Sequence, residues 1–147
     1  MPQISPAARS LARRALLHEA GGRAEPAALA EAADRADARL RERLADLIGT
    51  TGYTALVARA VRLAQAEVPA LKGVTVDAGV EGSLHGVRAL ALTSDDPTVA
   101  EAGVTALLAH VIGLLSTFIG EDLALRLVRD AWPDFAHDQV STGGAHE

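Results

Sequence analysis

Apolar residues recur along most of this chain at the three- and four-residue steps of an α-helix. The clearest stripe follows Pro26 and consists of Leu29, Ala33, Ala36, Leu40, Leu44 and Leu47. Charged residues separate these positions, and Asp37 and Arg41 have the four-residue spacing of a favourable ion pair on the solvent face. The stripe predicts an amphipathic helix over about 26–48.

Residues that start and stop helices divide the rest of the chain. Ser5-Pro6 is typical of a helix start, because serine caps the first amides and proline suits the first helical position. Gly21-Gly22 and Gly49 suit the backbone just past a helix end. The predicted helices span about 6–20, 26–48, 51–68, 80–92, 97–119 and 121–131. Short loops between the first three predict antiparallel neighbours.

The segment from Val104 to Ile119 is almost wholly apolar. A helix that is apolar on every side is surrounded by protein or by lipid. This run has 16 residues, fewer than the roughly 20 that cross a bilayer. We therefore predict an all-α fold, a compact bundle of about six helices around a central apolar helix at about 97–119, with no membrane contact.

The segment 69–79 is ambiguous, since Val74-Thr75-Val76 suits either a short strand or an extended loop. A lone strand would have no pairing partner, so a loop is predicted. The steps between Val80, Leu84 and Val87 then predict the helix over about 80–92.

Composition supports one domain of 147 residues, predicted to cover 1–133 with a frayed polar tail at 134–147. There is no cysteine, which excludes disulfides, thiolate metal sites and cysteine nucleophiles. The N-terminus lacks the pattern of a signal peptide, so a cytoplasmic location is expected. Arginine almost entirely replaces lysine, which suggests a GC-rich bacterial coding sequence. The net charge of −5 argues against nucleic-acid binding.

His110 is the most distinctive polar residue, because it lies within the apolar run. A phosphoacceptor histidine would need an exposed ring with a cation soon after it, and Val111-Ile112-Gly113 follows instead. We therefore expect a buried histidine that hydrogen-bonds within the core or at a dimer seam.

Catalytic and metal-binding patterns are not found in the sequence. There is no Glu-x-x-His pair and no His-Glu-x-x-His, and Ser116 and Thr117 have no base nearby in the sequence. The hydroxyls of Ser116 and Thr117 are expected to bond to preceding carbonyls of their own helix. No metal, no cofactor and no enzymatic activity are predicted.

The leading hypothesis is a small intracellular bacterial regulatory or adaptor protein that acts through protein–protein contact and forms a homodimer. Its motivation is the surplus of apolar surface on the helix at 97–119, which a second copy would cover. The predicted interface residues are Arg35, Arg39, Arg43, Leu114 and Phe118.

Two other hypotheses remain open at this stage. One is a small-molecule-binding bundle with an apolar pocket, in which His110 and Tyr53 are the polar ligand-binding groups. The other is a helix-turn-helix regulator, suggested by the short turn at Gly49-Thr50-Thr51-Gly52 and opposed by the lack of basic charge.

Overall fold

The computed structural model describes residues 4–22, 25–69, 71, 75–77, 83–85 and 97–132. The elements are α1 (Pro6–Glu19), α2 (Pro26–Glu67), β1 (Thr75–Asp77), β2 (Ser83–His85), α4 (Pro97–Ile119) and α5 (Glu121–Ala131). The fold class is all-α, as predicted, with one small pair of strands beside the helices. The prediction of about six helices around a central one is not confirmed, since the described residues form four.

Helix α1 begins and ends where the sequence predicts. The Ser5 side chain accepts a hydrogen bond from the Ala8 amide at 3.1 Å, and Pro6 occupies the first helical position. Gly21 and Gly22 follow the helix with φ of 67° and 84°, a conformation that glycine adopts without a steric penalty. These caps confirm the predicted helix boundaries.

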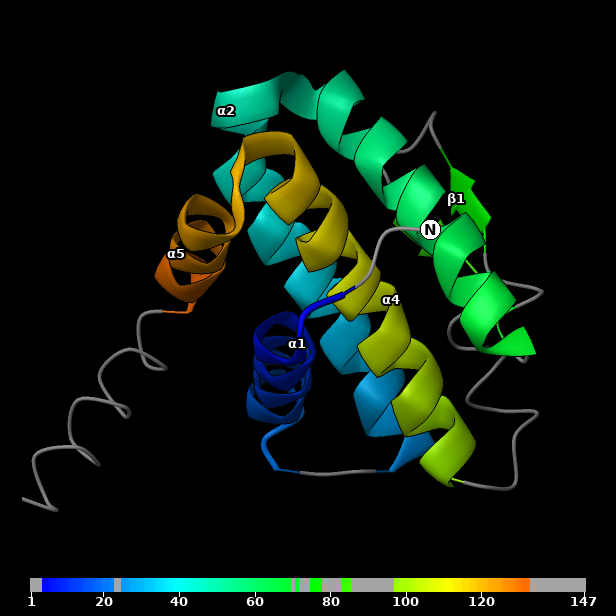
Figure 1. The fold of residues 1–147 in the computed structure, drawn as a ribbon. Coiled ribbons are helices and arrows are strands. Elements are labelled where there is room, and N and C mark those ends of the chain that lie inside the picture. Colours follow the sequence, from blue (N-terminus) through cyan, green and yellow to red (C-terminus); the bar gives the residue numbers. More distant parts are fainter. Residues whose placement is uncertain are drawn as a thin grey trace, which may run out of the picture.

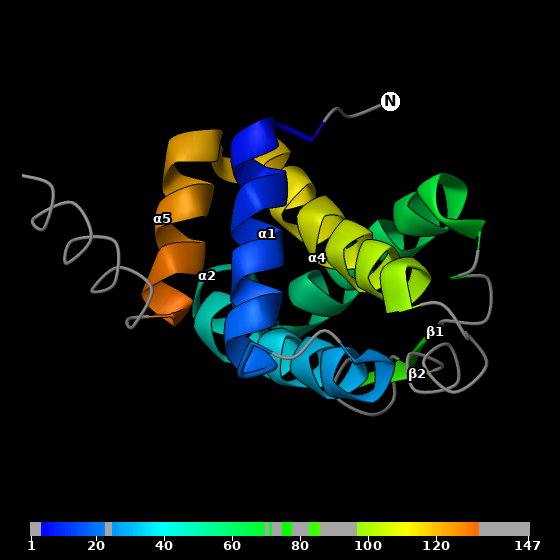
Figure 2. The same ribbon diagram turned by 90° about the horizontal axis from the view of Figure 1, so that it is seen from below.

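Helix α2 joins two predicted helices into one kinked element. Gly49 has φ 80° and ψ 160°, while the residues on either side of it are helical. The kink turns the second half of α2 away from the direction of the first, and both halves lie beside α4 (Figure 1; Figure 2). The predicted four-residue turn is therefore a single non-helical residue, and the helix-turn-helix hypothesis loses the turn on which it depended.

Helix α4 packs against α1, α2 and α5 (Figure 2). Its middle is closed to solvent, and Ala109, Ile112 and Leu115 are fully buried. By length and composition alone, Glu101–Ile119 could cross a membrane, but 56% of this stretch is buried inside the protein. A core helix passes the same test.

The segment between α2 and α4 corrects two predictions. β1 pairs antiparallel with β2, with Val76 opposite Leu84. Residues 75–77 of the predicted loop at 69–79 therefore form a strand, and the helix predicted at 80–92 is wrong at 83–85. The reason is that each of these segments supplies the pairing partner that the other was thought to lack. The remainder of 80–92 and the predicted tail at 134–147 lie outside the described residues.

Candidate functional site

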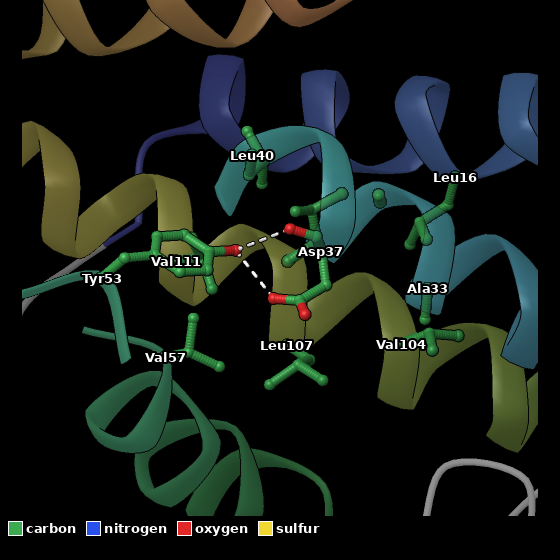
Figure 3. Close-up of a pocket in the computed structure, with 11 residues that line it drawn as sticks. Leu16, Ala33, Asp37, Leu40, Tyr53, Val57, Val104, Leu107 and Val111 are labelled. Carbon is green, nitrogen blue, oxygen red and sulfur yellow. Dashed lines mark hydrogen bonds between the residues drawn. The ribbon is translucent and has the colours of Figure 1, made fainter. Parts of the chain in front are cut away.

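A buried carboxylate lies in the interior of α2. The Tyr53 hydroxyl donates to Asp37 Oδ1 at 2.8 Å and contacts the Asp37 main-chain oxygen at 3.3 Å (Figure 3). Arg41 donates to the other carboxylate oxygen at 3.0 Å. The hydrogen bond between Tyr53 and Asp37 therefore connects the two halves of α2 across the kink at Gly49.

Burial controls the ionisation of this pair. Removal from water raises the pKa of Asp37, and the hydrogen bonds from Tyr53 and Arg41 oppose that shift. Burial, with the Asp37 charge beside it, raises the pKa of Tyr53 well above its usual value. The Tyr53 hydroxyl thus keeps its proton at neutral pH and donates a hydrogen bond to Asp37, which is a structural role.

A pocket of about 20 Å³ lies beside this pair, lined by residues of α1, α2 and α4 (Figure 3). Its lining is Leu16, Ala33, Ala36, Asp37, Leu40, Tyr53, Val57, Val104, Leu107, Leu108 and Val111. This space holds about one water molecule, whereas ligand pockets measure roughly 300–1,000 Å³. Tyr53 lines the pocket and His110 does not, so the structure does not bring the two predicted ligand-binding residues together.

His110 lies where α1, α2 and α4 meet. The residue is 7% exposed, and its Nε2 is 3.1 Å from Glu67 Oε1. Arg9 donates two hydrogen bonds to the same carboxylate, at 2.9 and 2.8 Å. The prediction of a buried, hydrogen-bonded histidine is confirmed.

The charges around Glu67 act on both of its neighbours. Burial lowers the pKa of His110, against the influence of Glu67, which favours the protonated ring. The hydrogen bonds from Arg9 lower the pKa of Glu67, with a smaller contribution from His110. A surface groove of about 340 Å³ opens here, lined by Arg9, Arg13, Glu67, Thr98, Glu101, Ala102, Thr105 and Ala106. Two ion pairs line it, so an ionic ligand would have to disrupt one of them.

The three arginines of α2 that were predicted at an interface donate hydrogen bonds to other parts of the protein. Arg35 donates to the main-chain oxygen of Glu19 at 2.5 Å, Arg39 to that of Ala131 at 3.2 Å, and Arg43 to that of Asp130 at 3.1 Å. These carbonyls lie at the ends of α1 and α5, where helices leave acceptors unpaired. These arginines therefore join three helices, while Arg35 and Arg39 remain about half exposed.

Glu19 is the centre of a second polar cluster. Its side chain is 7% exposed and accepts a hydrogen bond from Trp132 Nε1 at 3.0 Å. Arg39 Nε also donates to this carboxylate, and Arg35 Nε lies 3.6 Å from it. The cluster fixes the end of α1 to α2 and to the residue that follows α5.

Three large apolar side chains are exposed at one end of the bundle, among the described residues. Leu47 is 51% exposed, Phe118 70% and Leu123 42%. They flank the α2 kink and the turn at Gly120 between α4 and α5, which lie at the same end (Figure 1). We call these three residues the apolar end. Leu114, which the sequence predicts in an interface with Phe118, is buried in the core.

The described residues hold no group of three or more potential metal ligands close enough to share an ion. Comparison of the chain with models of protein families, with curated proteins and with solved structures finds no match.

Several important residues were not predicted. Asp37 was assigned to the solvent face, yet it falls between Ala33 and Leu40 on the buried stripe, a spacing that could have revealed it. Leu47 was assigned to the buried stripe and is exposed. The partners of Glu19 and Glu67 come from distant parts of the chain, and no local spacing indicates them.

Proposed function

We propose that this chain is a small helical regulatory or adaptor protein that acts by binding a protein partner through the apolar end. The observation that carries this proposal is the exposure of Leu47, Phe118 and Leu123, the large apolar side chains that are exposed among the described residues. Burying a large apolar side chain stabilises a complex by roughly 1.5–3 kcal/mol. A grouped set of such side chains is typical of an interaction surface.

The charges beside the apolar end favour a partner with basic margins. Asp46, Glu121 and Asp122 are exposed next to these side chains in the sequence, against two exposed cations, Arg43 and Arg126, one turn from Leu47 and Leu123. The margin is therefore acidic overall, and electrostatic complementarity favours a basic partner surface. A second copy of the chain, as the sequence predicts, would place acidic margins together and would associate more tightly at higher salt.

The test is native mass spectrometry of the full chain purified from its own cells. Phe118→Asp places a charge at the apolar end, and Ala55→Asp places the same charge at an exposed site on the second half of α2. The wild type and Ala55→Asp are expected to carry a second protein, and Phe118→Asp to lose it. The retained mass identifies a second copy or another protein. A wild-type monomer without added protein mass contradicts the proposal.

A further inference from the structure

A surface groove of about 340 Å³ runs between the first half of α2 and α5. Its walls are Arg39, Glu42, Arg43, Asp46, Asp130 and Ala131. Hydrogen bonds from Arg39 and Arg43 to main-chain oxygens at the end of α5 hold the two helices together. The groove is therefore built by fixed contacts between two helices.

The groove leads towards the apolar end. The first half of α2 runs from Arg39 towards the kink, and α5 runs back from that end to Ala131. The two segments are therefore antiparallel (Figure 1; Figure 2). Leu47 follows Asp46 on α2, and Leu123 lies two turns before Asp130 on the same face of α5. An extended partner in the groove can thus contact apolar side chains at one end and charges along its length.

The charges in the groove are not equivalent. The two arginines already donate hydrogen bonds to protein acceptors, Arg39 to Glu19 and Ala131, and Arg43 to Asp130. Those acceptors are main-chain oxygens except for the Glu19 carboxylate, so these hydrogen bonds do not use the carboxylates of Glu42, Asp46 and Asp130. The lining thus carries three carboxylates and two guanidinium groups, of which Arg39 is already paired with Glu19, so its net charge is negative.

We propose that this groove binds a basic amphipathic segment of a partner protein, with its apolar residues on Leu47 and Leu123 and its cations on Glu42, Asp46 and Asp130. This inference rests on the proposed function and specifies its partner. The chain's own C-terminal residues do not fit, since Asp134, Asp138 and Glu147 give them an acidic composition. Helical partners commonly bind in such grooves through one apolar face.

The probe is a fluorescein-labelled amphipathic peptide of leucine, alanine and arginine, compared with a twin in which every arginine is glutamate. Fluorescence anisotropy measures the binding of both peptides to the full chain. The arginine peptide is expected to bind and the glutamate twin is not. Added salt is expected to weaken binding, because the charge pairs lie near solvent.

Isosteric variants locate the binding. Glu42→Gln with Asp46→Asn removes two charges from the groove, and the matched control Glu25→Gln with Glu31→Gln removes two exposed charges elsewhere on the chain. Two partly exposed charge pairs predict about a tenfold weaker affinity for the groove variant and less than about a twofold change for the control.

Three outcomes would overturn this inference: no binding of the arginine peptide, equal binding of both peptides, or equal loss in both variants. Sedimentation of the wild type and the groove variant tests a fourth outcome. A homodimer that the groove substitutions weaken would show that a second copy of the chain occupies the groove, and not a different partner. The proposed function is judged separately by the effect of Phe118→Asp on the retained partner, so either proposal can fail alone.

Discussion

Two carboxylates connect the helices of this bundle by nearly the same arrangement. Glu19 interacts with Arg35 and Arg39 and accepts a hydrogen bond from the indole of Trp132. Glu67 accepts two hydrogen bonds from Arg9 and lies beside the imidazole of His110. Each cluster thus joins cationic side chains and one aromatic ring nitrogen from different parts of the chain.

The two clusters differ in burial and in the ring that they use. The Glu19 side chain is 7% exposed and that of Glu67 is 37% exposed. An indole N–H does not titrate, whereas an imidazole changes charge near neutral pH. The Glu19 cluster is therefore expected to contribute more to stability, and the Glu67 cluster to be the one that responds to pH.

The largest expected effect is that of Glu19→Ala. This substitution removes the Glu19 carboxylate that accepts from the buried Trp132 indole and that Arg35 and Arg39 share. A loss of about 3 kcal/mol in the free energy of unfolding is expected. Urea denaturation measures it, with the exposed Glu31→Ala as a control expected to change stability little. Equal effects of the two substitutions would show that the cluster contributes nothing specific.

Trp132→Phe separates the indole from the arginines in the same cluster. Trp132 is 1% exposed, so the smaller ring loses packing as well as the hydrogen bond to Glu19. A loss of about 2 kcal/mol in the free energy of unfolding is expected. The loss should be the same at about pH 5.5 and about pH 7.5, which lie about one unit on either side of an ordinary histidine pKa. Thermal unfolding at both pH values tests this, and a loss confined to one of them would refute it.

Glu67→Ala provides the direct contrast with Glu19→Ala. Arg9 and Glu67 have side chains that are 44% and 37% exposed, and water replaces much of what their ion pair supplies. A loss of less than about 1 kcal/mol is expected from the same urea denaturation. If this loss matched or exceeded that of Glu19→Ala, burial would not be the property that distinguishes the two clusters.

The same contrast shows what the sequence could and could not predict. Helix boundaries follow from nearby residues, so Ser5, Gly21 and Gly120 mark real ends. The hydroxyls of Ser116 and Thr117 bond to carbonyls four residues earlier, as predicted, because this geometry is fixed by the helix itself.

Contacts between distant residues were beyond local spacing. Trp132 meets Glu19 from 113 positions away, and His110 meets Glu67 from 43 positions away. The strand pair failed for the same reason, since β1 was judged without β2. Of the predicted interface residues, the structure places Phe118 on the surface and Leu114 in the core, a choice set by helix packing that composition does not determine.

The smallest expected effect is a pH dependence from His110. Burial lowers its pKa in the folded protein, so the unfolded chain, in which histidine titrates near 6.5, takes up a proton at a higher pH. Stability is therefore expected to fall as pH drops through about 6.5. Glu67, whose pKa is also lowered, contributes stability that is lost only at lower pH, below the ordinary glutamate value near 4.5.

His110→Gln tests this dependence, because glutamine keeps a hydrogen-bond donor for Glu67 but does not titrate. Urea denaturation at pH values of about 7.5, 6.5 and 5.5 gives the slope of stability with pH for both proteins. The slope of the variant is expected to be shallower, whatever its absolute stability, since other histidines contribute equally to both. Parallel slopes would mean that the titration of His110 does not contribute to stability. The imidazole of the Glu67 cluster would then be no more sensitive to pH than the indole of the Glu19 cluster.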